Sequence, residues 1–144
     1  DGGRCSCGNH GCLETIAGTR AILRRADEAL HGADAAAAEL TWPEFAQRHA
    51  AGVSPLVEVI AETGRYLGVA LAGLIAGFNV ETIVIAGRVA DVGDTLLEAA
   101  RAEARRRALP SMVDETTIRY SSLGIEMVLL GCSALVLQQE LGIV

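Results

Sequence analysis

Aromatic side chains are scarce in this chain of 144 residues, which contains one Trp, two Tyr and two Phe. Alanine and leucine supply most of the apolar content instead, and both residues favour helices. Hydrophobic residues make up 51% of the chain, enough for a buried core. The composition therefore favours a helix-rich domain over an all-β sandwich. The length suits one domain or part of one.

Positive charge is also in deficit, because the formal net charge is −6. An acidic surface repels the phosphate backbone of nucleic acids. We therefore expect this stretch to bind nucleic acid poorly by itself, so that any contact with DNA would need a further domain.

No apolar run reaches the roughly 20 residues that a membrane-spanning helix needs. The most apolar stretch, LGVALAGLIAGFNV at 67–80, is interrupted by glycines and an asparagine, and we predict that it is a buried core helix. The chain has no signal peptide or initiating methionine and opens on DGGRC. We expect the C-terminal piece of a longer cytoplasmic protein without membrane contact.

Helical periodicity and capping signals predict helices in five places. In chain order these are 13–30, 41–52, a long helix from Ser54 through the apolar stretch, 95–110 and 125–141. Thr41 with Glu44, and Thr95 with Glu98, are expected capping boxes. Ser54 is the expected N-cap of the long helix, whose apolar stripe is predicted to run from Leu56 through Leu74 to Phe78.

Two β-branched segments predict strands, and 31–40 is predicted to be a loop. The strand at 81–87 is expected to be fully buried, and the strand at 116–122 alternates between its two faces. Helices alternating with strands indicate an α/β fold. Because two strands are too few for a closed sheet, we expect the rest of the sheet upstream or in another chain.

Three of the four cysteines fall within CSCGNHGC, residues 5–12. A disulfide within Cys-x-Cys is sterically difficult, and the redox spacing Cys-x-x-Cys is absent. Glycine permits positive φ angles, so Gly8 and Gly11 would let Cys5, Cys7 and Cys12 turn toward one point. Zinc commonly takes three Cys and one His. We therefore favour a zinc site over inert or redox-active cysteines.

The fourth zinc ligand is not assigned by the residues. His10, His31 and His49 are each predicted to be surface histidines, and Cys132 is predicted to be a small core residue of the last helix. A residue upstream of Asp1, a water molecule, His10 or a neighbouring chain could complete the site.

The string CSCGNHGCLE resembles C-x-C-G-x-x-G-C-x-E, the motif of the ROK family of repressors, open reading frames and sugar kinases. The segment at 81–110 and the closing LLGCSALVL agree more weakly, so the resemblance covers essentially all 144 residues. It implies part of a ROK C-terminal lobe, with a zinc-binding cysteine loop at 1–14 and the remainder at 15–144. The implied fold is α/β, the C-terminal lobe of an actin-like ATPase (ribonuclease H-like), helix-rich with few strands.

The resemblance also implies roles for individual residues. Cys5, Cys7 and Cys12 would be zinc ligands, with a histidine upstream of the chain as the fourth, and the loop would shape a sugar pocket. Glu14 would accept hydrogen bonds from sugar hydroxyls; otherwise it is a first-turn residue favoured by the helix dipole. Gly87 matches the nucleotide-binding glycine of family kinases, but the surrounding AGRVADVG lacks their successive glycines.

Two functions follow from the resemblance. The favoured one is the sugar-sensing effector domain of a homodimeric transcriptional regulator, which would bind a small sugar or amino sugar and contact DNA through an upstream domain. The alternative is the C-terminal half of an ATP- and magnesium-dependent hexose kinase similar to glucokinase. Its catalytic base would precede residue 1, so no catalytic residue is assigned; Asp91 and Asp94 are interpreted as turn and helix-cap residues. A scaffold with structural zinc and no ligand is a third possibility.

Overall fold

The structure of the protein, a computed structural model, describes residues 2–32 and 40–142. Most of the predicted loop at 31–40 lies outside these residues. The elements in chain order are α1 (Glu14–Ala17), α2 (Thr19–His31), α3 (Trp42–Ala50), α4 (Ser54–Phe78), β1 (Thr82–Ile85), the 3₁₀ helix η1 (Arg88–Val92), α5 (Asp94–Arg107), α6 (Pro110–Val113), β2 (Thr117–Tyr120), η2 (Gly124–Glu126) and α7 (Met127–Leu141).

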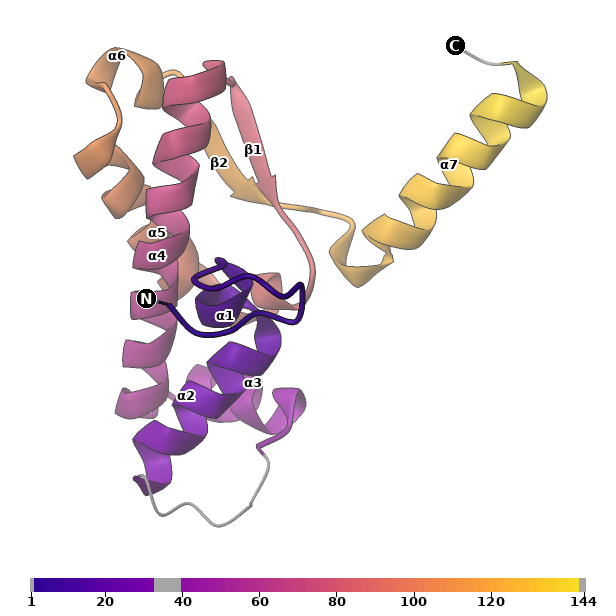
Figure 1. Ribbon diagram of the computed structural model, residues 1–144. Coiled ribbons are helices and arrows are strands. Elements are labelled where there is room, and N and C mark those ends of the chain that lie inside the picture. Colours follow the sequence, from indigo (N-terminus) through magenta and orange to yellow (C-terminus); the bar gives the residue numbers. More distant parts are fainter. Residues whose placement is uncertain (1, 33–39, 143–144) are drawn as a thin grey trace.

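The long helix α4 is the centre of the fold, and α5 packs along it (Figure 1). Gly64 and Gly68 lie in this contact. A Cβ atom added at Gly64 would lie 2.5 Å from the carbonyl oxygen of Leu96, and one added at Gly68 would lie 2.5 Å from that of Ala100. The two backbones therefore approach closely because these positions carry no side chain.

Two buried clusters flank this contact. One joins the C-terminal half of α4 to α5 and the sheet through Leu71, Ile75, Ala100, Ala104 and Ile118. The other joins the first half of α4 to α2, α3 and the start of α5 through Ile22, Phe45, Leu56, Ile60 and Leu96. Each of these side chains is at most 4% exposed, so α4 shares its length between two cores.

The strands β1 and β2 pair in parallel, with Ile83 opposite Ile118, and α5 is part of the connection between them. The predicted alternation of the second strand is confirmed, since Ile118 is buried while Thr117 and Arg119 are exposed. The prediction that the first strand is fully buried is wrong, because only Ile85 is buried and Val84 is 43% exposed. Two strands leave part of β1 uncovered in the described structure.

Several helix boundaries differ from the predicted ones because of the local backbone conformation. Gly18, with φ −71° and ψ 151°, is extended and divides the predicted helix at 13–30 into α1 and α2. The capping box of Thr41 and Glu44 is confirmed. That of Thr95 and Glu98 is wrong, because α5 begins at Asp94, with Gly93 as its N-cap.

The apolar stripe and N-cap of α4 also differ from the prediction. Val53 is the N-cap, so Ser54 is the first helical residue. Leu56 and Ile60 are buried as expected, whereas Leu74 is 44% and Phe78 is 73% exposed. The buried face of α4 instead includes Gly64 and Gly68, which contact α5. The end of the predicted stripe therefore points away from the core.

The length of α4 exceeds the apolar run seen in the sequence. Its 25 residues are enough to cross a membrane by length and composition, with a mean hydropathy of 1.4 in the most apolar window of 18 residues. However, 44% of that window is buried inside the protein, and both cores draw on this helix. Helix α4 therefore has the contacts of a core helix.

For two residues, the predicted exposure to solvent is wrong. His49 is buried, 8% exposed, and stacks on Phe45 with 6.1 Å between ring centroids; burial lowers its pKa. Cys132 is exposed, because α7 projects away from the described body of the chain (Figure 1) and none of its residues is buried.

We predict that Gly68→Ala destabilises this chain by about 1–3 kcal/mol, because the new methyl group overlaps the backbone of α5. The matched control is Gly73→Ala in the same helix, where a Cβ atom meets nothing within 4 Å and alanine should raise stability by up to about 1 kcal/mol. Urea unfolding measures both. Equal effects of the two substitutions would contradict the close contact.

Glu103 provides a pH-dependent contribution to stability. It is 8% exposed on α5 and accepts hydrogen bonds from Arg106 and Arg107, which lower its pKa from 4.5 to about 2. A lowered folded-state pKa stabilises the fold at higher pH, and this contribution is lost as pH falls from about 4.5 toward 2. The difference in unfolding free energy between wild type and Glu103→Gln should therefore shrink over that range; a constant difference would refute the assignment.

Candidate functional site

The cysteine loop brings three sulfur atoms together. The Sγ atoms of Cys5, Cys7 and Cys12 all lie within 4.8 Å of one another. Gly8 has φ 93° and Gly11 has φ 70°, as the sequence predicts for a loop this tight. Such a group of soft donors can hold a metal ion of the kind that prefers thiolates.

Backbone hydrogen bonds hold the loop closed around the sulfurs. The N–H of Cys5 donates to Asn9 O at 2.8 Å, and the N–H of Gly8 donates to Cys5 O at 3.0 Å. An antiparallel bridge joins Arg4 to His10. His10 is exposed, as predicted, and so is His31. Among residues 2–32 and 40–142, no fourth Cys, His, Asp or Glu joins the cluster.

The three thiols differ in environment. Cys5 is buried, Cys12 is half-buried and Cys7 is exposed. The pKa of Cys12 is raised to about 11, first by its hydrogen bond with the Cys7 side chain and then by that with Cys5. The pKa of Cys5 is lowered, chiefly by the backbone N–H of Cys7. The Cys12 thiol therefore keeps its proton to a higher pH than the Cys5 thiol, and a bound cation would favour the thiolate form at all three positions.

Glu14 lies two residues after Cys12 and begins α1. Thr15 ties this short helix to the loop, since its hydroxyl donates to Cys12 O at 2.7 Å. The Glu14 side chain is exposed and borders two cavities. One, of 950 Å³, is also lined by Arg4, Cys5 and residues at the start of α2. The other, of 430 Å³, lies against the apolar face formed by α4 and β1.

The turn after β1 meets the same smaller cavity. Ala86 and Val89 line it together with Glu14, so the structure brings the neighbours of Gly87 close to the predicted sugar contact. Gly87 itself precedes η1, with φ 89°. It does not lie at the N-terminus of α5, which begins only at Asp94.

The two acidic residues of this turn are structural, close to what the sequence predicts. Asp91 lies in η1, and its Oδ2 accepts a hydrogen bond from Trp42 Nε1 at 3.3 Å. Asp94 occupies the first position of α5, one residue after the N-cap. Neither carboxylate belongs to a metal-binding group in the described residues.

Arg25 positions the helix that carries Glu14, and sequence reasoning missed it. Its guanidinium donates to Ile16 O at 3.3 Å and to Thr63 Oγ1 at 3.1 Å, and it pairs with Glu62. It thereby joins α1, α2 and α4, and it holds the helix that carries Glu14. No sequence signal identifies it, because Glu62 is 37 residues away.

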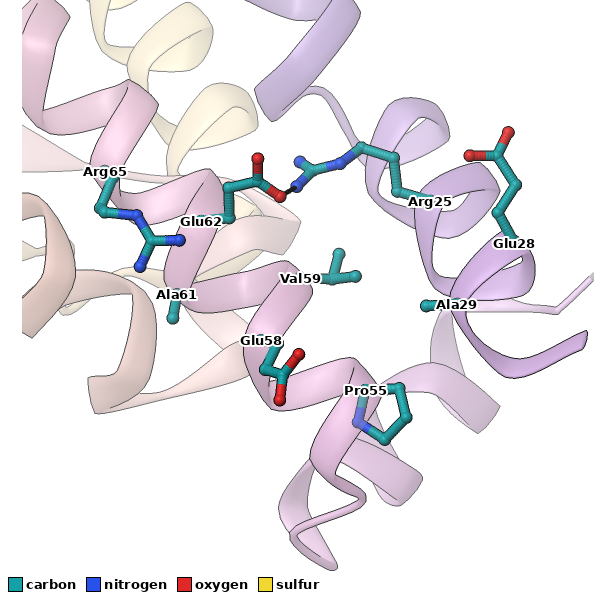
Figure 2. Close-up of a pocket in the computed structure, with 9 residues that line it drawn as sticks. All are labelled: Arg25, Glu28, Ala29, Pro55, Glu58, Val59, Ala61, Glu62 and Arg65. Carbon is teal, nitrogen blue, oxygen red and sulfur yellow. Dashed lines mark hydrogen bonds and ion pairs between the residues drawn. The ribbon is translucent and has the colours of Figure 1, made fainter. Parts of the chain in front are cut away.

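Arg25 also lines the groove between α2 and α4, whose volume is 710 Å³ (Figure 2). Figure 2 shows the guanidinium directed at Glu62 across this groove. Two charged groups of the groove, Arg25 and Glu62, are thus already paired with each other. The cysteine cluster and Glu14 lie outside it, so the groove is not the candidate site.

Comparison with known proteins places this arrangement in a family. The model of the ROK family matches residues 1–139. A glucokinase of Halalkalibacterium halodurans is 35% identical over 96% of this chain and 44% of its own length. The regulator NagC of Escherichia coli is also 35% identical, over 85% of this chain and 31% of its own length. The chain therefore spans less than half the length of these relatives.

The fold agrees with this match. A ROK family glucokinase from Streptomyces griseus, solved with glucose and AMPPNP, superposes with a TM-score of 0.81 and 24% identity over 94% of this chain and 47% of its own. The helix-rich α/β architecture is that of the actin-like ATPase fold, as predicted. Since the family model covers nearly the whole sequence and the motif residues form one compact loop, this chain belongs to the ROK family.

Proposed function

We propose that this chain is the sugar-sensing part of a ROK transcriptional regulator and that it binds a small sugar or amino sugar beside Glu14. The observation that carries the proposal is the exposed Glu14 carboxylate immediately after three converging sulfurs, at the border of two cavities. In this proposal the cysteine loop occupies residues 1–14, and residues 15–144 form the remainder of a C-terminal lobe.

The cysteines are proposed to hold zinc. Cys5, Cys7 and Cys12 present the donor atoms that zinc prefers. The fourth ligand would come from outside the described residues. Bound zinc would act as a structural cross-link of the loop, while the protein's own hydrogen bonds from Cys5 and Gly8 set the loop's shape. The wall behind Glu14 would then be rigid before a sugar arrives.

Glu14 is proposed to accept hydrogen bonds from sugar hydroxyls. An ionised carboxylate can accept two such bonds, and these are stronger than bonds between neutral groups. Because Thr15 and Arg25 hold α1 in place, little conformational freedom remains to be lost when the sugar binds. DNA would be contacted through a further domain, consistent with the net charge of −6, and the regulator would act as a cytoplasmic homodimer.

The turn after β1 favours a regulator over an enzyme. In this turn the 3₁₀ helix η1 buries Val92, which is 5% exposed, and directs Asp91 toward Trp42. These residues are used for packing, and only one glycine, Gly87, follows the strand directly. The turn therefore lacks the successive glycines that let a backbone approach a nucleotide closely.

The second candidate is the C-terminal half of an ATP-dependent ROK hexose kinase. The 35% identity to a glucokinase supports it. In that case magnesium, ATP and a catalytic base would be supplied by a part of the protein outside this chain, and Gly87 would face the nucleotide. The sugar contact at Glu14 would be common to both candidates.

For the zinc site, we expect Cys7→Ser in the complete protein to lower both the zinc content per chain and the affinity for sugar, because the loop loses one of its three sulfur donors. Elemental analysis and calorimetric titration measure these quantities. The control Cys132→Ser, on the exposed α7, should change neither. Loss of zinc with unchanged sugar affinity would show that the loop does not shape the sugar site.

For the sugar site, Glu14→Gln in the complete protein should weaken binding of the cognate hexose or amino sugar by about 1–3 kcal/mol, the value of a hydrogen bond to a charged group. Glu115→Gln, in the exposed turn before β2, is the matched control and should bind normally. A panel titration followed by measurement of operator release and ATP consumption tests the function. Sugar-dependent release supports the regulator, ATP turnover supports the kinase, and no sugar binding refutes both.

A further inference from the structure

Two sulfurs of the cysteine loop lie in direct contact. The Sγ atoms of Cys7 and Cys12 lie 3.6 Å apart, and that of Cys5 lies within 4.8 Å of both. A disulfide bond measures about 2.05 Å. The Cys7–Cys12 pair therefore needs an approach of only about 1.5 Å, which side-chain rotation and a small loop adjustment can supply.

Accessibility selects the same pair. Cys7 is exposed and Cys12 is half-buried, so an oxidant in solution can reach one of them directly. Cys5 is only 9% exposed. The fourth cysteine, Cys132, lies on the projecting helix α7, and it is not a member of the sulfur cluster.

The backbone between the two cysteines can accommodate the change. The four intervening residues include Gly8 and Gly11, both with positive φ, and a Cβ atom at Gly8 would meet nothing within 4 Å. The hydrogen bond from Cys5 N to Asn9 O fixes the base of the loop. The N–H of Gly11 also donates to Gly3 O at 3.0 Å, so the adjustment falls on Cys7 and the open position at Gly8.

We propose that Cys7 and Cys12 form a reversible disulfide under peroxide, and that this oxidation removes two of the three sulfur donors from the metal site. The disulfide follows from the geometry of the pair alone, whereas the loss of metal rests on the zinc site of the proposed function. The loop is then a redox-sensitive element two residues before Glu14.

The chemistry balances with hydrogen peroxide as the oxidant. The sulfur of Cys7 attacks one peroxide oxygen, the O–O bond breaks, and Cys7 becomes a sulfenic acid while water leaves. The sulfur of Cys12 then attacks Cys7 Sγ, the S–O bond breaks, and a second water leaves with the thiol proton. Overall, two thiols and one peroxide give one disulfide and two waters, and a dithiol reductant reverses the result.

The test uses the complete protein, both as purified with zinc and after removal of metal by a chelator. Hydrogen peroxide is added, free thiols are alkylated, and the links are mapped by peptide mass spectrometry. We expect the thiols of this segment to fall from four to two, with a single Cys7–Cys12 link, and zinc to appear in solution in step with that link. Reductant and added zinc should restore the starting state.

Variants separate the possible results. Cys5→Ser and Cys132→Ser should still form the link, and Cys7→Ser should not form it. A link that includes Cys5, irreversible sulfinic acid at Cys7 without a link, or no oxidation at all would overturn the proposal. Protein that never holds zinc but still forms the Cys7–Cys12 link would refute the zinc site and leave the disulfide standing, so the two failures can be told apart.

Discussion

The close approach of α4 and α5 is the constraint on which the rest of the structure depends. Two helix backbones can come this near only where side chains are absent, and Gly64 and Gly68 provide that absence one turn apart. In the chain, β1 precedes α5 and β2 follows it. The contact places α5 so that these two strands can pair in parallel. The remaining length of α4 is then free to form the second core with α2 and α3.

The candidate site is attached to this framework by a few polar contacts. Arg25 links α2 to Thr63 of α4 and to the carbonyl of Ile16 in α1, and Thr15 links α1 to the cysteine loop. The guanidinium of Arg25 therefore fixes the helix of Glu14 relative to α4, and the hydroxyl of Thr15 fixes it relative to the cysteine loop. This explains how a helix of only four residues, too short to be stable alone, can present a functional side chain.

Features that depend on near neighbours in the chain were predictable. The capping box of Thr41 and Glu44 forms as its spacing indicates. The positive φ angles of Gly8 and Gly11 and the convergence of the three sulfurs follow from the same kind of local pattern. In each case the interacting groups are within a few residues of one another, so composition and spacing contain most of the information.

The sequence by itself determined the cysteine cluster, its place directly before Glu14, the order of helices and strands and the family. The tertiary structure alone decided which residues are covered: His49 of α3 is buried, Cys132 of α7 is exposed and β1 is only partly covered. It also decided the role of Arg25, whose partner lies 37 residues away. The physical reason is that burial and long-range pairing depend on which elements meet in space, and hydrophobic pattern identifies an apolar face without identifying what packs on it.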